Sequence, residues 1–299
     1  MNKKYRSDDS GAVDMSFTTL ALLGVQSVAF PGESFGTAMK ACYTAPGTTS
    51  CVPWPANKEL VVFEHTLQAT QGNIAVMNHF WCGGSWPGYE NNVMRYYVDG
   101  EEKASVEYPF GLGHGSTMQD NDAPWSAGQV FGKTGAPSGI FNTYVVPFSA
   151  SIKVTVELRD LPRLPSGGAG GDAEPDTTLE AETKRFWIIL RGHRIVGESA
   201  AGSNPYRPAI PLPGSGMALP HTARLKTFSN AGVRLKAGGQ MTLFNSTANG
   251  CGAVFLVSLA VQSDGGPTFL EGCFRTYLSG GTAPAMLLSS GTEDYFLGA

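Results

Sequence analysis

The residues best suited to chemistry in this sequence are two glutamates near its C-terminal end, Glu271 and Glu293. They lie at equal distances along the chain from Thr282, so an antiparallel hairpin centred there would set them opposite one another. Directly opposed residues in such a hairpin have Cβ atoms about 4.5–5.5 Å apart. Retaining glycosidases hold their two carboxyl groups about 5–5.5 Å apart. The spacing therefore predicts a pair of catalytic carboxylates, a chemistry that requires no cofactor.

The same segment also has a purely structural interpretation. Ser290-Gly-Thr-Glu293 fits a capping box, in which the glutamate only begins a short helix. Glu271 precedes Gly272 and would suit an ordinary turn. Pro284 cannot donate to a strand ladder, and a register slip of one residue would place the two glutamates on opposite faces. Both interpretations stay open at the level of sequence.

Aromatic residues near glycines offer possible stacking surfaces for sugar rings, namely Trp81, Trp86 and Trp125. A tryptophan in a β-sandwich is nevertheless more often part of the core. Other chemistries lack their motifs: the sequence contains no nucleophile elbow, phosphate loop, dinucleotide fingerprint or paired-histidine zinc signature. His79, Cys82 and His114 lack the spacing of metal ligands, so no metal site is expected.

Short β-branched or alternating runs predict strands along most of the chain. The expected strands are 17–30, 59–63, 74–77, 151–158, 185–190, 253–257 and 269–277. Segments 92–98 and 104–108 flank Asp99-Gly100, a dipeptide typical of hairpin turns. No helix of ten or more residues is expected, and the pattern predicts an all-β sandwich or jelly roll.

Composition agrees with a turn-rich β protein and limits the partners. Charged residues make up only 15% of the 299, with 38 Gly and 19 Pro, which argues against helical bundles and disorder. The net charge is −4 and the basic residues are scattered, so no nucleic-acid partner is expected. No apolar run approaches the roughly 20 residues that cross a bilayer, so no membrane span is expected.

Cysteine usage and one sequon point to an extracellular location, secreted or on the cell surface. Cys42 and Cys51 flank a short loop and are expected to form a disulfide, the alternative being unpaired thiols. Asn245-Ser-Thr247 is an acceptor sequence for N-glycosylation. The apolar run 17–30 follows acidic residues instead of the positive charge of a signal peptide, so we expect the leader to be absent from this chain.

Two Pro/Gly-rich passages organise the chain. The stretch 161–184 is expected to be a long surface loop. The stretch 204–220 separates two units, expected at 1–222 and 223–299, the second of which carries both glutamates.

Several motifs occur in order over nearly the whole chain: Arg6-Ser-Asp-Asp-Ser-Gly-Ala-Val-Asp14, Asn78-His-Phe-Trp81, 95–101 with 105–107, 110–115, Asn142-Thr-Tyr-Val-Val-Pro-Phe148 and Gly291-Thr-Glu-Asp-Tyr-Phe296. Their types and order resemble glycoside hydrolase family 172, also catalogued as domain of unknown function 2961. The resemblance implies two jelly rolls in tandem, homo-oligomers, and furanosidase-type activity on fructose- or arabinose-containing glycans.

The resemblance also implies a retaining mechanism, with Glu293 matching the nucleophile and Glu271 the acid/base. Further substrate contacts are expected from the residues Asp294, Trp81, His114 and Asn142. This chain stops at Ala299, directly after the final motif, where the family continues, so the second jelly roll is expected to be incomplete in it.

Two alternatives to an enzyme follow from the same features. High glycine content, low charge and an open edge in an unfinished jelly roll suit a non-catalytic extracellular subunit of a filament or surface layer. The aromatic residues also suit a glycan-binding module that lacks hydrolytic activity. Cys273 and Phe274 stand where many family members carry a further acidic residue, which is compatible with loss of activity.

Overall fold

A computed structural model describes residues 34–43, 52–53, 59–67, 74–84, 91–114, 124–127, 130–133, 139–159, 184–195, 210–211, 218–220, 222–236, 238–245, 254–259, 261, 272–277 and 287–289. Strands predominate among these residues, and every pairing except that of β1 with β2 is antiparallel. The predicted all-β class is therefore confirmed.

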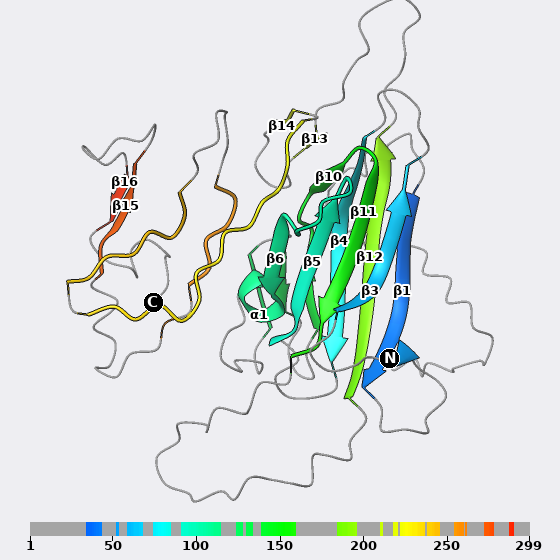
Figure 1. Ribbon diagram of the computed structural model, residues 1–299, viewed down its shortest axis with the longest axis horizontal. Helices are drawn as coiled ribbons and strands as arrows, with labels where there is room; N and C mark the ends of the chain where they lie inside the picture. Colours follow the sequence, from blue (N-terminus) through cyan, green and yellow to red (C-terminus); the bar gives the residue numbers. More distant parts are fainter. Residues whose placement is uncertain are drawn as a thin grey trace, which may run out of the picture.

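The larger of two main sheets has eight strands in the order β2-β1-β12-β4-β9-β8-β7, and β10 also pairs with β4 (Figure 1). Its strands are β1 (Ser34–Tyr43), β2 (Val52–Pro53), β4 (Ile74–Gly84), β7 (Trp125–Ala127), β8 (Phe131–Lys133), β9 (Gly139–Asn142), β10 (Val146–Phe148) and β12 (Lys184–Ile195). The long central pair β4 and β12 runs in register from Phe186 opposite Gly84, with one irregularity between Arg191 and Gly192.

The smaller sheet has four strands in the order β3-β11-β5-β6 and lies in front of the larger sheet in Figure 1. Its strands are β3 (Glu59–Thr66), β5 (Val93–Val98), β6 (Val106–Pro109) and β11 (Ser151–Glu157). A single helical turn, α1 (Phe110–Gly113), follows β6 directly.

One core joins the two sheets into a sandwich. Phe80 and Leu190 from the larger sheet and Met94 and Val154 from the smaller sheet are all 0% exposed and belong to one buried cluster. The alternation of buried and exposed residues along β5 and β11 arises because successive strand residues point to opposite faces. Truncating a buried phenylalanine such as Phe80 to alanine in such a core costs about 3–5 kcal/mol.

The predicted hairpin around Asp99-Gly100 is confirmed, with Arg95 of β5 opposite Glu107 of β6. Asp99 and Gly100 have φ values of 53° and 82°, the left-handed conformation that aspartate and glycine tolerate best. The Asp99 carboxylate also accepts hydrogen bonds from the backbone N–H groups of Ser149 and Ala150, at 2.8 and 2.6 Å. This hairpin is therefore tied to the turn between β10 and β11.

Other strand predictions had mixed outcomes. Segments 59–63, 74–77 and 185–190 lie within β3, β4 and β12, and 151–158 coincides with β11 except for its last residue. The described part of segment 253–257 forms no strand, so that prediction is wrong. Val254 is 55% exposed there. The segment forms no strand because a run of apolar residues needs a paired neighbouring strand to become one. Segment 17–30 lies outside the described residues.

Residues 222–228, here called the strap, leave the sandwich along the edge of β6 (Figure 1). The backbone N–H of Thr227 donates to the Ser105 carbonyl at 2.9 Å, and the N–H of Glu107 donates to the Thr227 hydroxyl at 2.7 Å. Arg224 forms an ion pair with Asp99 at 2.8 Å. The strap thus covers the edge of the smaller sheet, where unpaired backbone groups would otherwise face solvent.

Outside the two main sheets, the described strands are few and short. β13 (Ile210–Pro211) pairs with β14 (Ala218–Leu219) before the strap, and β15 (Phe274–Thr276) pairs with β16 (Leu287–Ser289) after it. The predicted strand 269–277 is observed as β15 alone among the residues described there. No helix within the described ranges has the length and apolar character needed to cross a bilayer.

Candidate functional site

Three of the six predicted site residues lie in the described part of the chain. Trp81 is on β4, Asn142 ends β9, and His114 follows α1 directly. Glu271, Glu293 and Asp294 lie outside the described residues. The structure brings His114 and Asn142 together, while Trp81 faces the opposite side of the larger sheet.

His114 and Asn142 form the centre of a buried polar network. Nδ1 of His114 lies 2.6 Å from the Phe110 carbonyl oxygen, and its Nε2 lies 2.8 Å from Nδ2 of Asn142. Nδ2 also donates to the Tyr108 hydroxyl at 3.1 Å, and Oδ1 accepts from the backbone N–H of Tyr144 at 3.2 Å. The imidazole and the amide are thus fully hydrogen-bonded, as buried polar groups must be.

These contacts fix the protonation of the network. A neutral imidazole satisfies both of its partners, because Nδ1 donates to the carbonyl while Nε2 accepts from the Asn142 amide. Burial lowers the pKa of His114 to about 4, opposed only in part by the Phe110 carbonyl. Burial also raises the pKa values of Tyr108 and Tyr144 well above the ordinary phenol value. The network is therefore uncharged at neutral pH.

The turn α1 places His114 at this position. The N–H of Phe110 donates to the Asn92 carbonyl at 2.8 Å, and the N–H of His114 closes the turn on the Gly111 carbonyl at 3.0 Å. The Tyr144 hydroxyl donates to the Gly113 carbonyl. A Cβ atom at Gly113 would overlap the ring of Tyr108, so the close approach of this ring to the backbone requires glycine. Segment 110–115, which resembles a family loop, thus begins as a helical turn.

The network lies beneath the C-terminal part of the chain. The ring of Phe255 meets Tyr144 edge to face with centroids 5.6 Å apart, and Leu256 packs against the core. His114 and Asn142 are 0% and 1% exposed, so contact with a substrate would require this core to open and stays a prediction. What the arrangement does directly is hold the segment 254–259 against the sandwich.

Trp81 belongs to a row of residues on the outer face of the larger sheet. Paired residues in an antiparallel ladder share a face, and Trp81 pairs with Ile189 of β12 and Phe141 of β9. Their neighbours Phe80 and Leu190 point into the core, so this row points away from it. Trp187, two residues before Ile189 on the same face, is 38% exposed. Trp81 thus lies on the outer face of the larger sheet, opposite to the face that carries Asn142.

The predicted hairpin before the final motif is present. β15 and β16 are antiparallel, with Arg275 opposite Leu288. Continued without irregularity, this register would set Glu271 opposite Thr292, one residue short of Glu293. Direct opposition of the two glutamates therefore requires one extra residue, as in a β-bulge, between the described rungs and the glutamates.

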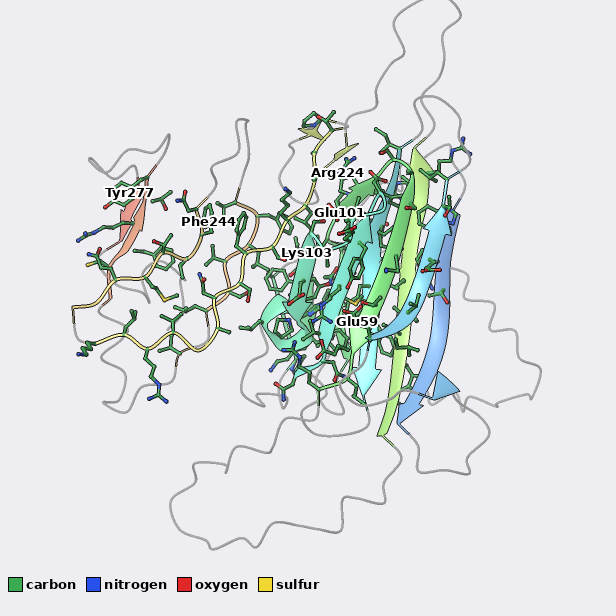
Figure 2. All side chains as sticks on the ribbon, in the orientation of Figure 1. Glu59, Glu101, Lys103, Arg224, Phe244 and Tyr277 are labelled. Atoms are coloured by element: carbon green, nitrogen blue, oxygen red, sulfur yellow. The ribbon has the colours of Figure 1, made fainter. Side chains whose placement is uncertain are left out.

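An ionic cluster on the outer face of the smaller sheet was missed by sequence reasoning. The Arg95 guanidinium lies 2.9 Å from Glu59, 2.7 Å from Glu107 and 2.7 Å from Glu157. Glu157 also pairs with Arg159 at 3.0 Å. Glu59, labelled in Figure 2, marks this face. A charged residue beside buried apolar positions on each of β5, β6 and β11 was the available signal, but the pairing of the strands was needed to join these residues.

The remaining predicted features lie partly outside the described residues. Trp86 and Cys51 lie outside them, as do the side chains of Trp125 and Cys42, so the Cys42–Cys51 disulfide stays a prediction. The residues that the structure describes contain no cluster of His, Cys, Asp and Glu suited to a metal ion.

Comparison with models of known protein families gives no match, and comparison with curated protein sequences gives none either. Function is therefore inferred from the residues and their geometry.

Proposed function

We propose that the chain is an extracellular glycoside hydrolase-like protein of the family 172 type, acting on fructose- or arabinose-containing furanosides. Its two units would be tandem jelly rolls. The ordered motifs along the sequence support this assignment, and the all-β sandwich is compatible with it.

The observation that carries the proposal is the antiparallel pairing of β15 with β16. Glu271 lies three residues before β15 and Glu293 four residues after β16. Both glutamates therefore lie just past the paired strands, at the end of the hairpin away from its loop. A bulge at Gly291 would supply the extra residue that direct opposition requires, since glycine is common at bulges.

The proposed mechanism has two steps. The Glu293 carboxylate attacks the anomeric carbon while Glu271, in its protonated form, gives its proton to the leaving oxygen. The Glu271 carboxylate then removes a proton from water, which displaces Glu293 from the anomeric carbon. Two inversions give net retention of configuration. Asp294 would orient Glu293 or the sugar hydroxyls.

Hydrolysis of aryl arabinofuranosides and fructofuranosides tests this proposal. We expect release of the aryl alcohol with retained anomeric configuration, read by NMR. Glu271→Gln and Glu293→Gln should each lower kcat by about 10²–10⁴-fold or more, the contribution of a general acid or a nucleophile. With an activated leaving group, azide should form a glycosyl azide in Glu271→Gln, because azide needs no base.

Glu64→Gln is the matched control, since Glu64 is an exposed glutamate on β3 of the other unit. It should retain full activity. Hydrolysis with inversion, or equal activity of all three variants, would reject the roles given to Glu271 and Glu293.

A second candidate is a non-catalytic extracellular building block, and one observation favours it. Most of the exposed large apolar residues in the described ranges follow the strands of the sandwich along the chain: Phe228, Val233, Leu235, Phe244, Val254, Phe255 and Tyr277. Figure 2 labels Phe244 and Tyr277 on these outlying segments. Apolar residues that face solvent gain free energy when another chain covers them, so this part of the chain suits self-association into a homo-oligomer or filament.

A further inference from the structure

Asn245 is the one asparagine in the sequence that has serine or threonine two positions later and no proline between. This sequence is the acceptor of N-linked oligosaccharides, which are bulky, polar and confined to the surface of secreted proteins. An acceptor sequence can carry a sugar only where the folded chain leaves the asparagine accessible, so the position of Asn245 in the fold decides its role.

The backbone directly before the acceptor asparagine is held by two contacts with the end of the strap. Nδ2 of Asn230 donates to the carbonyl oxygens of Thr242 at 3.0 Å and Leu243 at 2.8 Å. The rings of Phe228 and Phe244 pack with centroids 5.7 Å apart. Phe244 is labelled in Figure 2 on a segment outside both main sheets. The acceptor therefore follows a fixed stretch of chain that lies away from the strand ladders.

The Asn245 side chain is accessible and unengaged. The residue is exposed and belongs to neither a helix nor a strand. Within the described part of the chain its carboxamide makes no hydrogen bond. By contrast, Asn142 is 1% exposed and fully hydrogen-bonded, and Asn230 gives its amide protons to two carbonyl groups. Of these three amides, only that of Asn245 can react without loss of a structural hydrogen bond.

We propose that Asn245 is a glycosylation site and carries an N-linked oligosaccharide. In the transfer, Nδ2 of Asn245 forms a bond to the anomeric carbon of an oligosaccharide that is carried on a lipid diphosphate. The bond from that carbon to the diphosphate oxygen breaks, the lipid diphosphate leaves with the electron pair, and Nδ2 loses one proton. The proposal rests on the extracellular location in the proposed function, because the transfer takes place in the secretory pathway. It does not depend on the roles of Glu271 and Glu293.

The described fold can accept the sugar without rearrangement. Asn245 follows every strand of the two main sheets along the chain and belongs to neither buried cluster. A sugar on an exposed residue that makes no contacts displaces only water. We therefore expect thermal unfolding of the glycosylated chain to differ by less than about 2 °C from that of Asn245→Gln.

Expression of the full chain with an added signal peptide in eukaryotic cells tests the proposal. The chain recovered from the secretory pathway should migrate more slowly in a denaturing gel than the chain made without the signal peptide. Peptide N-glycosidase should restore the mobility and leave aspartate at position 245, as read by peptide mass spectrometry. Because Asn245 is exposed, this release should occur on the folded protein without denaturant.

Asn245→Gln and Thr247→Ala should each abolish the slower form, since each destroys the acceptor. Ser246→Ala is the matched control, because it alters the neighbouring residue, retains the acceptor and should be modified like the parent. A parent chain recovered from the secretory pathway without sugar, or sugar retained in Asn245→Gln, would overturn the proposal. So would release of the sugar only after denaturation, because Asn245 would then be covered.

The added signal peptide delivers the chain to the secretory pathway wherever the natural protein resides. An unmodified chain in this experiment therefore counts against Asn245 and leaves the extracellular location standing. An intracellular location of the natural protein would count against the proposed function. Failure of the glycosylation site and failure of the proposed function are thus distinguishable.

Discussion

Asn142 and His114 are far apart in sequence but meet in the core of the sandwich, where Nδ2 of the amide lies 2.8 Å from Nε2 of the imidazole. Asn142 uses its amide oxygen as well, for the backbone of Tyr144. Asn142→Ala would leave the imidazole and the Tyr144 N–H without these partners. We expect unfolding in urea to become easier by about 1–3 kcal/mol, the usual penalty for an unsatisfied buried group. Ser126→Ala, at an exposed position of β7, is the control and should unfold like the parent.

Stability should fall with acidity because of His114. Its pKa is about 4 in the folded protein against an ordinary value of 6.5. Between these two pH values the imidazole is protonated in the unfolded chain but not in the folded chain. The free energy of unfolding therefore decreases as pH drops through this window. The full difference corresponds to about 3 kcal/mol. Urea midpoints measured across the window should follow this trend.

The slope should be smaller in His114→Gln, which does not titrate. His79 and His193, whose pKa values burial also lowers, should supply what slope remains. An unchanged slope in His114→Gln would show that the imidazole is not buried in neutral form.

Arg95 should stabilise the fold because its guanidinium lies between carboxylates that would otherwise repel one another. Arg95→Met leaves three carboxylates, those of Glu59, Glu107 and Glu157, close together without their shared cation. Because two of these carboxylates are substantially exposed, we expect a loss of only about 1–2 kcal/mol in unfolding free energy. High salt should reduce the loss, since it screens repulsion between exposed charges. A loss that is independent of salt would instead indicate that the Arg95 stem acts by packing.

The apolar residues beyond the sandwich predict self-association. At micromolar concentration we expect light scattering to give a mass above that of one chain, with an interface of about 1,200–2,000 Å² or more. Phe228 and Phe244 pack with ring centroids 5.7 Å apart and are both exposed. Phe228→Ser should weaken the assembly, whereas Val61→Ser on the exposed face of β3 should not. A stable monomer of the parent chain would contradict this prediction.

Cysteine pairs can read the register of the C-terminal hairpin. In a Cys273→Ser background, Arg275→Cys with Leu288→Cys should form a disulfide on mild oxidation, because these residues are directly opposed. Glu271→Cys should then cross-link with Glu293→Cys if a bulge intervenes, and with Thr292→Cys if the ladder continues unchanged. Mass spectrometry distinguishes the pairs, and preferred linkage to Thr292→Cys would place the glutamates on opposite faces.

Local patterns predicted much of the fold. The hairpin at Asp99-Gly100 was accessible because its turn needs left-handed backbone that few residues tolerate. Segment 253–257 has similar strand propensity, but it has no partner in the described structure, and pairing is not encoded in the run itself. Propensity thus finds strands where a partner exists and overpredicts them elsewhere.

Less of the candidate site than of the fold could be predicted from the sequence. Trp81 and Asn142 were expected to share a site, yet the two-residue period of β4 and β9 puts them on opposite faces of the larger sheet. The burial of His114 follows from packing against Asn142 and Tyr144, which are distant along the chain. The hairpin β15–β16 was predicted, but its register differs by one residue from that needed for direct opposition of the glutamates.

Because the strap follows every strand of the two main sheets in the sequence, it covers the edge of the smaller sheet late during synthesis. β6 is an edge strand of the smaller sheet. The Thr227 N–H donates to the Ser105 carbonyl beside this edge, and the Thr227 hydroxyl accepts from the N–H of Glu107. A nascent chain that has emerged as far as residue 222 therefore exposes this edge, even with every strand of both main sheets already available. A protein truncated there would carry an open template for pairing with its neighbours, so aggregation of the isolated first unit would arise at β6.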